Sequence, residues 1–196
     1  MRIGIDFDNT IICYDKVFNA IGIEQDLLPK DLPYGKHYVR EYLRDNGQEA
    51  AWTKLQGIVY GERLDQAELY GGVMEFLLFC QAESIPCFIV SHKTQYPYSG
   101  DLYDLHASAN QWIEGHGLRN PVFFEPTKED KIRRVNELKC SHFIDDLPEF
   151  LLLPGFDKNI FKILFDPEKK YIKSKSGLYH VSSWDQILSM IKFNLR

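Results

Sequence analysis

Short apolar runs alternate with helical stretches along most of the chain, and this alternation limits the folds that it can adopt. Each run is rich in Ile, Val or Phe and is bounded by Gly, Pro or Asp, as in strands that are buried on both faces. The runs span residues 2–7, 85–90, 121–124, 142–144 and 160–165. Because strands that alternate with helices pair in parallel through right-handed crossovers, we expect an α/β fold with a parallel sheet of about five strands.

The segments between the runs show helical spacing of apolar residues. In 66–82, for example, apolar side chains recur so that one face of a helix points inward. Helices are also expected over 102–114, 128–138 and 183–193, and Thr127 is suited to cap the second of these.

One interval, from Cys13 to Leu64, contains no strand-like run. It predicts two helices, over 36–46 and 48–62, and at roughly fifty residues it is too long for a plain loop. We therefore expect a core domain of residues 1–12 and 65–196, built as a three-layer, Rossmann-like sheet. We expect residues 13–64 to form a small helical lobe inserted after the first strand.

Charge and cysteine content narrow the possible partners. The 196 residues include 28 acidic and 23 basic side chains, a net charge of −5, and the basic residues are scattered. This pattern argues against a nucleic-acid or anionic-membrane surface. The four cysteines form no CxxC pair, and no apolar run reaches the roughly 18 residues of a membrane span. We expect a cytoplasmic protein with reduced thiols and neither nucleic acid nor membrane as partner.

Acidic and hydroxyl side chains follow three of the apolar runs. Asp6 and Asp8 lie at the end of the first run, Ser91 follows the second, and Asp145 and Asp146 follow the fourth. In a parallel sheet, ligands bind at the carboxyl ends of the strands, near the point where the strand order reverses. These side chains are therefore candidates for one site.

The four aspartates at the ends of the first and fourth runs predict a cation-binding site. Asp6 and Asp8 alternate along an extended segment, so both point the same way and repel unless one is protonated or a cation lies between them. With Asp145 and Asp146 nearby, a hard divalent ion such as Mg²⁺ is favoured. Either pair alone is more simply a turn, but two pairs at strand ends, with a serine and a lysine, indicate an active site.

Four segments resemble the signature motifs of the haloacid dehalogenase-like (HAD) superfamily, in the same order. They are IDFDNT at 5–10, FIVS at 88–91, the lysine-bearing helix over 128–138, and HFIDD at 142–146. The resemblance covers the core strands across nearly the whole chain. It implies the phosphatase branch with a small helical cap, since the dehalogenases lack an acid at the position of Asp8.

The resemblance implies a role for each motif. Asp6 would be the nucleophile that forms an aspartyl-phosphate, and Asp8 the general acid and base. The Ser91 hydroxyl would hydrogen-bond a phosphoryl oxygen. Lys131 would neutralise charge on the aspartate and the phosphoryl group, with Lys128 as the alternative.

Metal ligands follow from the same resemblance. Asp146 would bind Mg²⁺ together with Asp6 and the main-chain oxygen of Asp8. Asp145 would act through a water molecule or by orienting its neighbours.

Further residues are candidates for substrate binding. Thr10, His92, Lys93 and Lys128 lie next to the motifs and are expected to touch the substrate. Each also has a structural interpretation, as a turn residue, a hydrogen-bonding histidine or a solvated lysine. Whether the tyrosine-rich loop 93–106 contacts substrate or only packs stays open.

The function indicated is a Mg²⁺-dependent phosphomonoester hydrolase acting on a small phosphorylated metabolite, such as a sugar phosphate or a nucleotide-like compound. The protein would be a monomer or a homodimer. The alternatives are a phosphotransferase or a protein phosphatase of the same superfamily, or a non-catalytic binding module that retains the fold.

Overall fold

The computed structural model describes residues 1–171 and 177–195 and divides into two compact units. Unit 1 comprises Met1–Ile12, Leu69–His92 and Asn120–Arg196, and unit 2 comprises Cys13–Glu68 and Lys93–Arg119. The division differs from the expected one, because residues 93–119 group with the helical segment and not with the sheet. One reason is the buried indole of Trp112, whose Nε1 donates to the carbonyl oxygen of Ala67 at 2.9 Å.

Unit 1 is built on a six-stranded sheet with the order β5-β4-β1-β6-β7-β8. The strands are β1 (Ile3–Ile5), β4 (Cys87–His92), β5 (Val122–Glu125), β6 (His142–Asp145), β7 (Phe161–Phe165) and β8 (Tyr179–Val181). All five neighbouring pairs are parallel. The predicted α/β fold with a parallel sheet is confirmed, and the sixth strand, β8, is a short edge strand that no apolar run announces.

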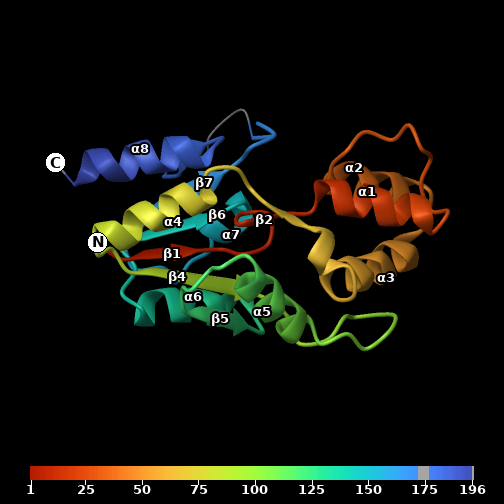
Figure 1. The fold of residues 1–196 in the computed structure, drawn as a ribbon, viewed down its shortest axis with the longest axis horizontal. Coiled ribbons are helices and arrows are strands. Elements are labelled where there is room, and N and C mark those ends of the chain that lie inside the picture. Colours follow the sequence, from red (N-terminus) through yellow and green to blue (C-terminus); the bar gives the residue numbers. More distant parts are fainter. Residues whose placement is uncertain (172–176, 196) are drawn as a thin grey trace. The chain divides into compact units, whose positions relative to one another are not determined.

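Helices cover both faces of this sheet (Figure 1). On one face lie α4 (Val73–Ala82) and α8 (Trp184–Asn194), which pack against each other through Phe76 and Trp184. On the other face, α6 (Lys128–Glu137) and α7 (Pro148–Leu151) bury a core that includes Phe143. Thr127 caps α6 as predicted, because its Oγ1 accepts the backbone N–H of Asp130 at 3.0 Å.

Helix α4 starts later than the sequence predicted. The apolar spacing begins at residue 66, but Leu64–Gln66 form a short 3₁₀ helix, η1, and Glu68–Leu69 form the two-residue strand β3. Gly72 then adopts a φ of 90° directly before the helix, a conformation that glycine reaches at little cost. Strand β3 pairs with β2 (Ile12–Cys13).

Unit 2 is helical. It contains α1 (Asp15–Glu24), α2 (Lys36–Asp45), α3 (Glu49–Tyr60), η1 and α5 (Leu105–Gly115). Aromatic side chains hold α1 and α3 together, with the ring centroids of Phe18 and Trp52 at 5.1 Å and those of Phe18 and Tyr60 at 5.7 Å. The helices over 36–46 and 48–62 were predicted, whereas α1 was not.

No helix in the described part of the chain combines the length and the apolar character needed to cross a membrane.

Gly4 lets the central strand lie close to its neighbour. A Cβ atom at this position would come within 2.6 Å of Phe143 Cδ2 and 3.1 Å of Cys140 Sγ. Both neighbours belong to the buried core under α6, so they have little room to move.

We therefore expect Gly4→Ala to lower the free energy of unfolding by about 1–3 kcal/mol through overpacking. Gly115→Ala is the matched control, because a Cβ there meets nothing within 4 Å. Urea unfolding of both variants measures the difference. Equal stability of the two variants would contradict the close packing at Gly4.

Candidate active site

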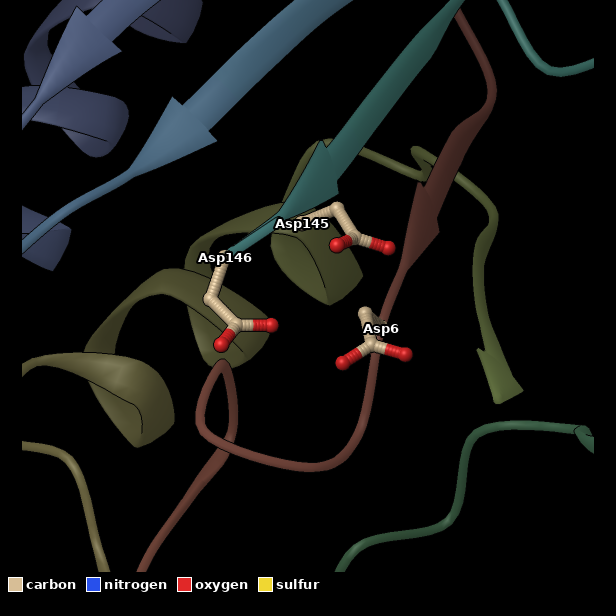
Figure 2. A group of neighbouring side chains, drawn as sticks. All are labelled: Asp6, Asp145 and Asp146. Carbon is tan, nitrogen blue, oxygen red and sulfur yellow. The ribbon is translucent and has the colours of Figure 1, made fainter. Parts of the chain in front are cut away.

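The site lies where the sheet reverses its strand order. Strands β1 and β6 are neighbours, although the chain visits β4 and β5 between them. The backbone N–H of Asp6, the first residue after β1, donates to the carbonyl oxygen of Ile144 in β6 at 2.9 Å. Since Asp145 ends β6 and Asp146 follows it, the three carboxylates converge at one edge of the sheet (Figure 2).

A tight turn after β1 fixes the side chain of Asp6. The carbonyl oxygen of Phe7 accepts the backbone N–H groups of Thr10, Ile11 and Ile12 at 3.1–3.4 Å. Asn9 takes a positive φ of 58°, which asparagine tolerates better than most residues. The turn directs the Thr10 hydroxyl to Asp6 Oδ2, at 3.3 Å.

Thr10, a candidate for substrate binding, is completely buried within unit 1. Its hydroxyl donates to Asp6, and its carbonyl oxygen accepts the Nε1–H of Trp184 at 3.1 Å. Trp184 lies 174 residues further along the chain, in α8. These contacts make Thr10 a link between the aspartate and the core.

The ammonium group of Lys131 bridges two of the carboxylates. Its Nζ donates to Asp6 Oδ1 at 2.5 Å and to Asp145 Oδ2 at 2.7 Å. The lysine side chain is only 4% exposed and that of Asp145 is completely buried. The second oxygen of Asp145 accepts the backbone N–H of Leu147 at 2.9 Å, so this carboxylate is held at both oxygens.

Burial controls the protonation of Asp6. It raises the pKa of Asp6 to about 7, aided by the charges of Asp145 and Asp8, while Lys131 opposes the rise. Burial also works to lower the pKa of Lys131, but attraction to Asp145 and Asp6 outweighs it and keeps that pKa above its ordinary value. The lysine therefore stays charged, and Asp6 needs further positive charge to be fully ionised at neutral pH.

The carboxylates are suited to hold a metal ion. One oxygen each from Asp6, Asp145 and Asp146 lies within 4.8 Å of the others. The donors are hard carboxylate oxygens, the type that Mg²⁺ prefers. Lys131 offsets part of their negative charge, and the remainder favours a divalent cation.

Ser91 and Asp8 lie together beside this group. Ser91 is within β4, opposite Phe124 of β5, and is fully buried. Its hydroxyl donates to Asp8 Oδ2 at 3.4 Å, a long hydrogen bond. The structure thus brings the second aspartate and the predicted phosphate-binding serine into contact.

The remaining candidates are more dispersed. His92 ends β4, its Nε2 lies 3.1 Å from the carbonyl oxygen of Pro126, and burial lowers its pKa. Lys128 opens α6 and is half-buried, and the described chain shows no hydrogen bond or ion pair for it. Lys93 belongs to unit 2, where its Nζ lies 5.0 Å from the ring centroid of Tyr60.

Sequence reasoning missed the groups that hold the acids in place. Leu147, whose backbone N–H binds Asp145, comes directly after the Asp-Asp pair in the sequence. Pro148, the next residue, is a sequence signal for the start of the short helix α7. The hydrogen bond from Trp184 to Thr10 has no such signal in the sequence, because the two residues are 174 positions apart.

Comparison with solved structures shows the same architecture. A HAD-superfamily hydrolase from Ehrlichia chaffeensis aligns over 100% of this chain and 97% of its own, with 14% identity and a TM-score of 0.57. A protein from Clostridium acetobutylicum described as a predicted phosphatase aligns over 98% of both chains, with 17% identity and a TM-score of 0.63. A Bacillus subtilis protein described as a HAD-hydrolase bound to magnesium aligns over 97% of this chain and 98% of its own, with 12% identity and a TM-score of 0.54.

No protein-family profile matches the sequence, and no curated protein matches it either. At these low identities the structural likeness shows the fold. The chain has the fold of the HAD-superfamily hydrolases, which confirms the fold that the four motifs implied.

Replacement of Lys131 tests the charge arrangement. Lys131→Met leaves two buried carboxylates without their cation, so we expect the free energy of unfolding to fall by about 3–5 kcal/mol near neutral pH. The loss of the lysine raises the pKa of Asp6 further. The folded variant then keeps a proton that the unfolded chain has released, so its stability falls as the pH rises from about 5 to about 8.

Chemical unfolding across this pH range is the measurement. Lys128→Met, one helical turn earlier on the same helix, is the control and should change stability little. A Lys131→Met protein whose stability rises over the same range would contradict the assigned charges.

Proposed function

We propose that the protein is a Mg²⁺-dependent phosphomonoester hydrolase that works through an aspartyl-phosphate on Asp6. The observation that carries the proposal is the lysine-bridged pair of Asp6 and Asp145, with Asp146 beside it, at the strand ends of a HAD-type hydrolase fold. The substrate is a small phosphorylated metabolite, such as a sugar phosphate or a nucleotide-like compound.

In the first half of the reaction, a carboxylate oxygen of Asp6 attacks phosphorus. A P–O bond forms to the enzyme and the P–O bond to the leaving group breaks, while Asp8 gives its proton to the departing alkoxide. In the second half, Asp8 takes a proton from water, which attacks the phosphoryl group and releases Asp6. The contact from Ser91 to Asp8 supports this assignment, because it restrains the Asp8 carboxyl group beside β4.

Charge neutralisation is divided between a lysine and a metal. We assign Lys131 the neutralisation of charge on the aspartate and the phosphoryl group, because its ammonium donates directly to Asp6. Asp6, Asp146 and the main-chain oxygen of Asp8 would hold Mg²⁺, and Asp145 orients the lysine. The metal, when bound, supplies positive charge that favours the ionised nucleophile and offsets charge on the phosphoryl group.

Substrate contacts are proposed for the groups at the same strand ends. Ser91 and His92 end β4, and Lys93 follows them in the sequence. Lys128 and the turn residue Thr10 are further candidates, although Thr10 already donates to Asp6. We place the activity in the cytoplasm, which accords with the four free thiols.

Phosphate release tests the function. We expect Mg²⁺-dependent release from one class within a panel of sugar phosphates, nucleotides, glycerol-type phosphates and phosphopeptides. Asp6→Asn should abolish it, because the variant lacks the nucleophile while the fold is retained. Turnover by folded Asp6→Asn would rule out the covalent mechanism, and release from phosphopeptides alone would favour a protein phosphatase.

A second variant separates the two halves of the reaction. Asp8→Asn removes the proton donor and acceptor, so we expect the rate to fall by about 10²–10⁴-fold. With a substrate whose leaving group needs no proton, the aspartyl-phosphate should accumulate and be detectable by mass spectrometry. An Asp8→Asn protein as fast as the parent would exclude the acid and base role.

A further inference from the structure

The Lys131 ammonium has aromatic as well as acidic neighbours. Its Nζ lies 4.3 Å from the ring centroid of Phe150 and 5.4 Å from that of Phe143. The shorter distance is well inside the range in which a cation is attracted to the face of an aromatic ring. Phe150 is 1% exposed, so this attraction acts where water does not screen it.

One short segment delivers both an acid and a ring to the lysine. Asp145 ends β6, and α7 begins at Pro148, where a proline is already suited to helical geometry. The N–H of Leu147 holds Asp145 Oδ1, and the carbonyl oxygen of Leu147 accepts the N–H of Phe150 at 3.1 Å. The orientation of Asp145 and the position of the Phe150 ring therefore depend on the same turn.

A ring suits this position better than a further polar group. The ammonium donates to two carboxylates. Burial, together with the charges of Asp145 and Asp8, already raises the pKa of Asp6, and a further acid would raise it more. An aromatic face attracts the cation without adding charge and without offering a strong acceptor that competes with Asp6.

We propose that Phe150 is a positioning residue for Lys131: its ring face, 4.3 Å from Nζ, holds the ammonium where it is shared between Asp6 and Asp145. The contact itself is independent of the proposed phosphatase activity. Its effect on turnover rests on that activity.

The test is a graded series of fluorinated phenylalanines at position 150 in the full chain. Each fluorine weakens the attraction of the ring for a cation with little change in shape. Phe156 is the matched position, because its ring packs on Phe150 at 5.5 Å and lies 4.4 Å from a different ammonium, that of Lys162.

The first measurement is a double-mutant cycle on stability. We expect the trifluorinated ring at position 150 to shift the unfolding equilibrium by about tenfold, and this shift to vanish in the Lys131→Met background. The series at position 156 should respond equally in both backgrounds. A fluorine effect at position 150 that is the same with and without Lys131 overturns the proposal.

Two further measurements keep the test decisive. If Lys131→Met does not fold, the stability of the fluorinated series is compared within position 150 alone. A loss that grows with each added fluorine supports the proposal, and a loss that is the same for every fluorinated ring overturns it. In the active enzyme, kcat should fall stepwise along the 150 series with KM nearly constant, and should not change along the 156 series.

Absence of turnover with every substrate would count against the proposed function alone, because the stability cycle is still measurable. A clear cycle on stability together with a flat kcat series would limit Phe150 to a structural contact and so overturn its positioning role.

Discussion

The Lys131 ammonium is the interaction on which the rest of the site depends. Two carboxylates that end neighbouring strands, Asp6 and Asp145, would repel each other in a buried setting, and the lysine turns this repulsion into two short hydrogen bonds. Helix α6 packs against β4 and β5, and this position lets the lysine reach the two carboxylates. One charge nevertheless does not balance the acids at this edge, and this imbalance is the physical reason to expect a metal ion.

The backbone supports this arrangement. The N–H of Asp6 is bound to β6 and the N–H of Leu147 to Asp145, so each acid is fixed through a main-chain group near it. The turn after β1 is formed by three backbone N–H groups that donate to the carbonyl oxygen of Phe7, without any side-chain hydrogen bond among these three. Such preorganisation is what electrostatic stabilisation of a reaction requires, since groups that are already oriented need not rearrange as charge develops.

Many residues of this site could be predicted from the sequence, because they lie at the ends of strands. Apolar runs located β1 and β6, so Asp6 and Asp145 could be placed at one edge. The sequence left both Lys131 and Lys128 as candidates for the lysine beside the nucleophile, and in the structure the ammonium group of Lys131 contacts Asp6. The contacts of Trp184 and Phe150 were not predicted, since each depends on packing between segments with no shared local pattern. Strand β8 has too little apolar character to show as a run.

The two units share the chain in an interleaved way. The chain passes from one unit to the other after Ile12, Glu68, His92 and Arg119. During synthesis from the N-terminus, unit 2 has all its residues once Arg119 is made, whereas β1 must wait for β6 before its second edge is paired. Strand β1 is therefore still unpaired on that edge when β4 already has both of its neighbours, β1 and β5. Asp8 is made together with Asp6, but Asp6 acquires Lys131 and Asp145 as neighbours only when α6 and β6 have been made.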